Sequence, residues 1–412
     1  MQRFIPMLRR LVPSAATFVL GTGSLFAVDI WIGWTESSER VADWAVFKSL
    51  IFPFSTLAMM GIDQIIVREP SKLSLILTKS VTLTALLAGL MSLGAWCVGA
   101  YHNGFQLFLA TALLGMSGLY FGIFRANCKF SMAHVARDGW KFLLLTGVLV
   151  ASFTTGTHPQ AIMITSCLGT VALSVVWWRR CSVEGMIEQH NEVTDFKSAL
   201  RISWPFCLAA FSLSIASYGE IVLLKLLNAD HEISQYFWAL ILYSYPAVFA
   251  NTYLVSLLGT FIRQNAKISA NIFINRRVSF MPLIMAVPVA VFTFGYIVEA
   301  VIFPEKETPL YLAVLISCVA GVRFTYTFIT SFIGALGCGD EIKRISLIYF
   351  CLAMTVPFAC VPIYLLTESA ALSVSLSSML HWLARGTVGW NLTARLAHRA
   401  VRGLPVVASS LR

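Results

Sequence analysis

The chain has 412 residues, of which 58% are hydrophobic and 12% are charged, and its formal net charge is +10. A soluble domain carries about 25% charged residues, so this composition, with a mean hydropathy of +0.76, excludes a soluble protein and predicts a multi-pass membrane protein. The basic residues are spread between apolar runs and do not cluster on one domain, which argues against a nucleic-acid partner.

Long apolar stretches recur along the chain, and we count about twelve that could cross a bilayer as helices. They lie at residues 11–34, 44–67, 80–100, 105–124, 141–157, 160–178, 203–227, 236–262, 278–303, 309–336, 345–366 and 369–394. The predicted fold is therefore an all-α polytopic membrane protein with its transmembrane helices arranged in two six-helix bundles.

The first six stretches form the predicted N-terminal bundle, residues 1–178. Arg3, Arg9 and Arg10 precede an apolar run that continues to Trp34. This run is too long for the hydrophobic part of a signal peptide and shows no persuasive small-residue cleavage site. We therefore predict an uncleaved first span.

A polar segment follows, at residues 179–202, and includes Glu184, Glu188 and Glu192. It predicts a cytoplasmic connector between the halves. The remaining six stretches form the predicted C-terminal bundle, residues 203–412, which ends in a basic cytoplasmic tail. No loop is long enough to hold a soluble catalytic domain.

Two spans share a pattern that indicates duplication of the two halves. Trp44-Ala45-Val46-Phe47 precedes Pro53 in the second span, and Phe237-Trp238-Ala239-Leu240 precedes Pro246 in the eighth. A proline inside a transmembrane helix weakens the local hydrogen bonds. We therefore expect both spans to bend.

The Lys and Arg residues indicate how the chain crosses the membrane. Most of the 30 fall in loops on one side, whereas the loops on the other side hold Arg40 and Lys306. Cytoplasmic loops carry the excess of Lys and Arg in membrane proteins. Both termini are therefore predicted to be cytoplasmic, with an even number of spans.

Motifs of metal sites and of enzymes are missing from the sequence. The nine cysteines form no C-x-x-C pair, and most lie inside apolar runs, so we predict no disulfide framework and no metal site. There is no Walker loop, and no paired-carboxylate or Ser-His-Asp arrangement lies in a loop that could hold a substrate. We predict that the chain is not an enzyme and uses no cofactor.

One charge lies deep within the tenth span. Arg323 is at the middle of the apolar run 309–337, roughly 21 Å of helix from either end. A guanidinium in lipid costs at least about 2.5–3.5 kcal/mol. We therefore predict that Arg323 lines an internal cavity and attracts anionic cargo. The structural alternative is an ion pair or a bond to a neighbouring helix carbonyl.

Other ionisable residues within the spans are candidates for the same pathway. The basic ones are expected to bind the substrate together with Arg323, and they are Arg385, Lys48 and Lys225. The acids and the histidine are expected to couple transport to an ion, and they are Asp29, Glu220 and His381. His381 and Arg385 are spaced i, i+4 and share a helix face.

Each of these residues also has a structural interpretation. Lys48 and Lys225 can extend to the outer interface, or they can form salt bridges with Asp29 and Glu220. His381 can be a structural histidine with its hydrogen bonds satisfied. Glu299 is expected to lie at the outer interface.

Two motifs resemble a known family. Gly61-Ile62-Asp63-Gln64-Ile65-Ile66-Val67-Arg68-Glu69 resembles the close of the second helix in the polysaccharide (O-antigen type) flippases. These belong to the multidrug/oligosaccharidyl-lipid/polysaccharide (MOP) exporter superfamily. The turn after the tenth span of that family is similar to Gly334-Ala335-Leu336-Gly337-Cys338-Gly339-Asp340-Glu341-Ile342-Lys343. The span number, the two halves and the short loops are also similar over the whole chain.

The resemblance implies a flippase in the bacterial inner membrane. Such a protein moves an undecaprenyl-pyrophosphate-linked oligosaccharide from the cytoplasmic to the periplasmic leaflet by alternating access, for surface polysaccharide synthesis. The implied partners are this lipid-linked oligosaccharide, a proton or sodium ion, and other polysaccharide-assembly membrane proteins. One alternative is a small-solute or drug exporter of the same superfamily. The other is a membrane polysaccharide polymerase or ligase, which the short outer loops disfavour.

Overall fold

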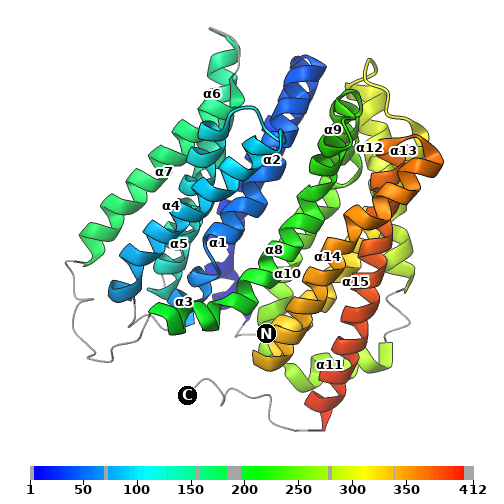
Figure 1. Cartoon of the computed structure of the whole chain (residues 1–412). Coiled ribbons are helices and arrows are strands. Elements are labelled where there is room, and N and C mark those ends of the chain that lie inside the picture. Colours follow the sequence, from blue (N-terminus) through cyan, green and yellow to red (C-terminus); the bar gives the residue numbers. More distant parts are fainter. Residues whose placement is uncertain are drawn as a thin grey trace. The chain divides into compact units, whose positions relative to one another are not determined.

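The computed structural model of this chain describes residues 4–68, 73–127, 129–153, 158–182, 196–276, 281–337 and 339–402. Over these residues the chain forms helices and no strand, as Figure 1 shows. Contacts between the helices divide the chain into two compact units. The first unit comprises Met1–Ile32 and Asp43–Val222, and the second comprises Gly33–Ala42 and Leu223–Arg412.

The first unit is built from the helices of the first half of the chain and most of the helix that follows. In chain order these helices are α1 (Phe4–Thr35), α2 (Ser38–Ala58), α3 (Ile62–Arg68), α4 (Leu73–Cys97), α5 (Gly104–Ala126), α6 (Phe130–Ser152), α7 (Pro159–Ser182) and α8 (Phe196–Leu226). Helix α5 packs against α3, α4, α6 and α7. Its buried small residues, Ala110, Ala112, Gly115 and Gly122, allow neighbouring helices to approach closely.

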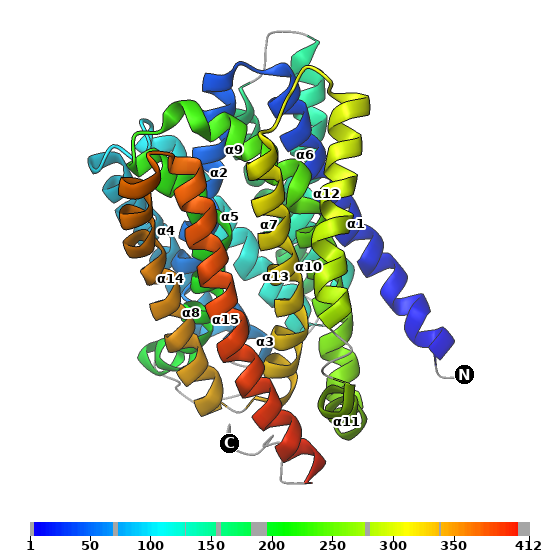
Figure 2. The same cartoon turned by 90° about the vertical axis from the view of Figure 1, so that its right-hand side faces the viewer.

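The second unit is centred on α13. Its helices are α9 (Asp230–Tyr243), α10 (Tyr245–Gln264), α11 (Ala266–Arg276), α12 (Met281–Ile302), α13 (Leu310–Leu336), α14 (Gly339–Thr367) and α15 (Ala370–Val401). Helix α13 packs against α9, α10, α12 and α15. Helix α15 also packs against α14 and against the short α11, which lies near its C-terminal end in Figure 2.

The helices confirm an all-α polytopic membrane protein. Within the described residues, eight helices are long and apolar enough to cross a membrane, and Val19–Thr35 is a shorter apolar helix. The predicted spans outside this set, 141–157, 236–262 and 369–394, lie on α6, on α9 with α10, and on α15. Each of the twelve predicted stretches therefore coincides with helix in the described part of the chain.

The predicted bundle boundaries differ from the two units in two respects. The segment Gly33–Ala42 belongs to the second unit, although it lies within the predicted N-terminal bundle. The second bundle was predicted to begin at residue 203, whereas α8 belongs to the first unit as far as Val222. Residues 183–195 of the predicted connector and 403–412 of the predicted basic tail lie outside the described residues. The boundaries at 178 and 203 stay a prediction.

The second predicted span is interrupted after Pro53, not at it. Pro53 lies inside α2, and the chain breaks between α2 and α3 at Met60 and Gly61, with φ of 50° and 69°. A Cβ atom on Gly61 would lie 2.7 Å from the carbonyl oxygen of Ser203 in α8. Glycine tolerates both the positive φ and this close approach, so the residue allows α8 to pack at the break.

The eighth predicted span is interrupted where expected. Helix α9 ends at Tyr243 and α10 begins at Tyr245, with Ser244 between them at φ −132° and ψ −47°. Pro246 lies in the first turn of α10, where the missing backbone N–H removes no intrahelical hydrogen bond. The predicted bend is confirmed in this span.

Candidate functional site

Three of the predicted site residues lie close together in the second unit. Arg323 is on α13, and His381 and Arg385 are on α15, which packs against α13. Their exposed fractions are 6%, 4% and 1%. The structure thus brings together two guanidinium groups and an imidazole within the protein.

Aromatic rings hold the two guanidinium groups. The Arg323 guanidinium carbon lies 5.0 Å from the ring centroid of Trp382, and that of Arg385 lies 5.7 Å from the same centroid. Arg385 also lies 4.2 Å from the ring centroid of Tyr349 and 4.9 Å from that of Tyr326. Cation–π contacts of this kind are worth about 2 kcal/mol when water is excluded. We call these residues, with His381, the arginine cluster.

Polar contacts fix the surroundings of the cluster. The Nδ1 atom of His381 lies 3.0 Å from the carbonyl oxygen of Leu352 on α14, while its Nε2 atom has no hydrogen-bond partner among the described residues. The side chain of Thr327 on α13 donates a hydrogen bond to Asn251 on α10. Asn251 in turn donates to the carbonyl oxygen of Arg323, at 3.4 Å. These bonds position the backbone of α13 beside the cluster.

Two acids of the second unit, the buried Glu299 and the half-buried Glu341, are engaged elsewhere. Glu299 accepts hydrogen bonds from Tyr243 and from the backbone and side chain of Thr308. Glu341 forms a bidentate pair with Arg399, at 2.8 and 3.1 Å. Glu299 is 9% exposed and lies near the end of α12, so its position at the outer interface stays a prediction.

The surroundings of Arg323 differ from both structural alternatives. Among the described residues, no carboxylate lies within ion-pair distance of its guanidinium, and no helix carbonyl accepts a hydrogen bond from it. Burying an ion costs several kcal/mol. A single cation–π contact contributes less stabilisation than this cost. The substrate-binding role expected of Arg323 and Arg385 stays a prediction.

A second group of predicted residues lies in the first unit. Asp29 on α1 and Lys48 on α2 form an ion pair, and Asp29 also accepts a hydrogen bond from the indole of Trp44 at 3.0 Å. The three side chains are at most 3% exposed. Lys48 is therefore buried against Asp29 and does not extend to the outer interface, and the predicted pairing of these two residues is confirmed.

Lys225 and Glu220 lie near the end of α8. Lys225 forms an ion pair with Asp230 at 2.9 Å, and its side chain is 31% exposed. This partner is the first residue of α9, and Lys225 ends at the surface, as the structural interpretation expected. Glu220 is 4% exposed. The roles predicted for both residues stay predictions.

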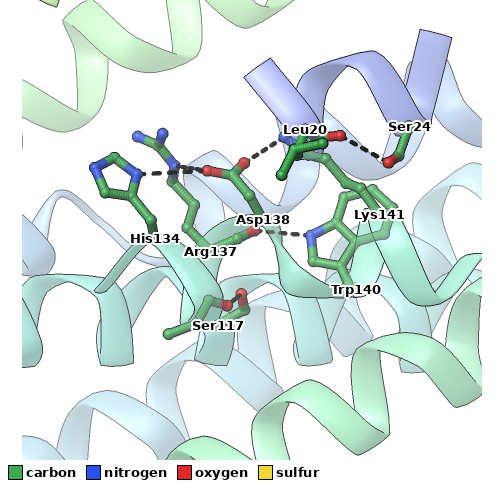
Figure 3. Close-up of polar contacts among 9 residues, drawn as sticks. Leu20, Ser24, Ser117, His134, Arg137, Asp138, Trp140 and Lys141 are labelled. Atoms are coloured by element: carbon green, nitrogen blue, oxygen red, sulfur yellow. Dashed lines mark hydrogen bonds and ion pairs between the residues drawn. The ribbon is translucent and has the colours of Figure 1, made fainter. Parts of the chain in front are cut away.

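Sequence reasoning missed an ionic cluster on α6. Asp138 is 3% exposed, and it binds Lys141 at 2.5 Å and Arg137 at 2.9 Å, with His134 at 3.8 Å. Figure 3 shows these three side chains directed at the Asp138 carboxylate. The spacings i, i+3 and i, i+4 on one helix were the available signal.

The charges around Asp138 decide its ionisation. Asp138 lies in the N-terminal half of α6, before the predicted span 141–157. Burial raises the pKa of its carboxyl group, but the charges of Lys141 and Arg137 and a hydrogen bond from His134 outweigh burial and hold the pKa well below its ordinary value. A Cβ atom on Gly21 would lie 2.7 Å from the Cβ of Asp138, so α1 packs directly on this cluster.

The aromatic members of the arginine cluster were also missed. Tyr326 lies three residues after Arg323, and Trp382 lies three residues before Arg385, so helical spacing could have suggested both. Tyr349 is on α14. No sequence signal connects it to Arg385, because the packing of α14 against α15 creates that contact.

Comparisons with known proteins support the fold. No model of a known protein family matches the sequence, and no curated protein matches it. Among solved structures, the chain is similar to one described as the inward-facing conformation of a multidrug resistance MATE family transporter of the MOP superfamily. The TM-score is 0.58 at 14% sequence identity, over 92% of this chain and 96% of that chain. The chain therefore has a MOP-exporter-like fold.

Proposed function

We propose that this chain is a flippase of the bacterial inner membrane with both termini cytoplasmic. Its cargo is a lipid-linked oligosaccharide that carries an anionic phosphate group, and it moves from the cytoplasmic to the periplasmic leaflet by alternating access. It works with other polysaccharide-assembly membrane proteins. The transporter-like fold supports the transport role, and the motifs at 61–69 and 334–343 support the cargo.

One observation carries the choice of an anionic cargo. The Arg323 guanidinium is buried at the middle of an apolar helix, against Trp382 and without a carboxylate in contact among the described residues. A second buried guanidinium, that of Arg385, lies against the same indole. A phosphate satisfies this arrangement because the planar guanidinium fork binds it with two hydrogen bonds.

The buried ion pair of the first unit supplies the proposed coupling site. The ammonium of Lys48 occupies the position next to Asp29 that a proton or sodium ion would neutralise. Neutralising Asp29 with such an ion would release Lys48 from the pair, because a buried ammonium without its counter-charge is unfavourable. We propose Glu220 and His381 as further coupling residues.

Substitution of Arg323 tests the cargo proposal. Arg323→Gln removes the charge, and Arg323→Lys keeps the charge but loses the bidentate geometry. A hydrogen bond to a charged group is worth about 1.5–3 kcal/mol. We therefore expect Arg323→Gln to slow export about tenfold or more and Arg323→Lys to retain part of it. Surface polysaccharide and cytoplasm-facing lipid-linked glycan in a strain that lacks the wild-type gene are the measurements.

Arg40→Gln is the matched control, because Arg40 is exposed and pairs with Glu36, which lies just before α2. This variant should export normally. The unfolding temperature of each purified variant separates loss of function from loss of fold. Full polysaccharide display by a correctly folded Arg323→Gln protein would show that Arg323 does not bind the cargo.

A drug exporter of the same superfamily is the second candidate. The similar solved structure is described as a multidrug resistance transporter. Deletion of the gene distinguishes the two functions. A drug exporter predicts increased sensitivity to cationic antibiotics with intact surface glycan, whereas the flippase predicts loss of the glycan.

A further inference from the structure

The segment that joins α1 to α2 belongs to a different unit from the rest of these two helices. Most of α1 and α2 lies in the first unit, whereas Gly33–Ala42 lies in the second. This segment contains the last turn of α1, the first turn of α2 and the two residues between the helices. It is therefore joined through the chain to one unit at both ends, while its packing belongs to the other. We call Gly33–Ala42 the strap.

Aromatic side chains hold the strap in the second unit. The ring centroid of Trp34 lies 5.7 Å from that of Phe303, and the Phe303 centroid lies 5.1 Å from that of Trp238. Both contacts are edge-to-face, an arrangement in which aromatic rings attract one another beyond the effect of burial. The indole N–H of Trp34 also donates a hydrogen bond to the carboxylate of Glu305, at 2.9 Å.

A glycine allows the strap to approach the second unit closely. A Cβ atom on Gly33 would lie 2.8 Å from the ring of Trp238 on α9. Cβ atoms do not pack at this distance unless a neighbouring group shifts. Glycine therefore fits here, and a larger residue would push the strap away from α9.

The chain on either side of the strap is fixed in the first unit. Before and after it, Asp29 on α1 and Lys48 on α2 form the buried ion pair described above. Asp43, the first residue after the strap, accepts a hydrogen bond from Gln160 on α7, at 2.7 Å. Separating a buried ion pair leaves two uncompensated charges in the protein. These contacts therefore resist a pull on the segment.

The contacts of the strap itself are easier to break. Trp34 is 46% exposed, and its hydrogen bond to Glu305 is also exposed. Water replaces the partner of an exposed group, so the loss of such a bond costs little. A rearrangement of the two units that pulls on the segment therefore releases Trp34 before it separates Asp29 from Lys48.

We propose that the strap is a releasable latch on the outer side of the membrane. Trp34 holds it against Phe303 and Glu305 in one state of the transport cycle and leaves them in another. The predicted topology places the loops that carry Arg40 and Lys306 on the outer side, which is where these contacts lie. The inference rests on the alternating access proposed above, because only a protein that changes conformation needs a latch that opens.

The distance between two spin labels tests the latch without a transport assay. The side chain of Arg40 in the strap is 56% exposed, and Leu310 at the start of α13 is 67% exposed. Both positions lie in the second unit, and cysteines there are labelled in a full-length background without the nine native cysteines. We expect one main distance when Trp34 is present. Trp34→Ala should raise the population of longer distances about tenfold, equivalent to about 1.4 kcal/mol.

A single unchanged distance in a correctly folded Trp34→Ala protein would refute the latch. Trp96→Ala is the matched control, because Trp96 is 54% exposed on α4, in the first unit. This control should give the distance of the parent protein. A shift of the same size in Trp96→Ala would show that the effect does not come from the strap.

A second pair of variants opens the latch by a clash and keeps Trp34. Gly33→Leu should displace the strap from Trp238 and lengthen the distance between the labels. Gly94→Leu is its control, because no atom lies within 4 Å of a Cβ at that position, and it should leave the distance unchanged. Equal distance distributions for the two leucine variants would contradict the latch.

A reversible cross-link connects the latch to transport. Gly33→Cys and Trp238→Cys place two thiols within reach of a short bifunctional thiosulfonate reagent, and each single-cysteine variant is a control. The cross-linked protein in proteoliposomes should stop moving an undecaprenyl-pyrophosphate-linked oligosaccharide, and a reductant should restore the movement. Continued transport after cross-linking would refute the latch and leave the flippase function in place. Absence of transport by the wild-type protein would instead refute the flippase function.

Discussion

The ion pair between Asp29 and Lys48 provides a quantitative test of the first unit. Both side chains are buried, and Asp29 is also bound by Trp44. Asp29→Asn leaves the ammonium of Lys48 without a counter-charge. Lys48→Met leaves the carboxylate of Asp29 without a counter-charge. Removing one partner of a buried pair costs about 3–5 kcal/mol.

The double variant Asp29→Asn/Lys48→Met should behave differently from either single one. It removes both charges and keeps the approximate shape, which is often neutral for stability. We expect its free energy of unfolding to lie within about 1 kcal/mol of the wild type. The double-mutant cycle should therefore give a coupling energy of about 3 kcal/mol or more.

Thermal unfolding in detergent, followed by tryptophan fluorescence, measures these differences. For a unit of about 200 residues, 1 kcal/mol corresponds to roughly 2–4 °C, so each single variant should unfold at least about 6 °C below the wild type. Additive effects of the two substitutions would refute the buried pair. Normal transport by the stable double variant would refute Asp29 as a coupling site.

Two further predictions concern the packing of the first unit. Asp138→Asn should destabilise the protein by about 1–3 kcal/mol, because it removes the ion pairs with Lys141 and Arg137. The lowered pKa means that this stabilisation is fully present above about pH 4, the ordinary value for aspartate, and is lost as the pH falls below it. Unfolding measured from pH 3 to pH 8 should therefore show a constant difference from the wild type that narrows at the acid end, and a difference that grows there would contradict the ionic role. Gly61→Ala should cost about 1–2 kcal/mol for the positive φ and about 1–3 kcal/mol for the clash with α8. Gly94→Ala is its control, with open space at its Cβ position, and equal unfolding temperatures for the two alanine variants would show that the break at Gly61 does not determine the packing of α8.

Local physical rules were enough to find the helices and most of the breaks. Apolar runs of sufficient length must form helices in a bilayer, since every backbone polar group needs an internal partner. The bend at Pro246 followed from the same reasoning. Pro53 lies inside α2, and this span breaks further along, at Met60 and Gly61, which the sequence reasoning did not predict.

The candidate site was predicted in part. The sequence identified Arg323, Arg385 and His381 as ionisable residues within apolar helices, and the packing of α13 against α15 places them together. Their environment could not be predicted, because the rings of Trp382 and Tyr349 meet the guanidinium groups through the packing of three helices. The same holds for Lys48, which the sequence left open between the interface and Asp29.

The sequence by itself determined that this chain crosses a membrane many times as helices and that charges lie within those helices. The first property follows from the length of the apolar runs, and the cost of transferring a charge into lipid makes the second one notable. The tertiary structure alone decided which charges neutralise one another. Asp29 pairs with Lys48, Lys225 pairs with Asp230, and Arg323 lies against an aromatic ring. The sequence alone does not select these contacts, because a contact between helices depends on how the helices pack and leaves no signal in the sequence of either one.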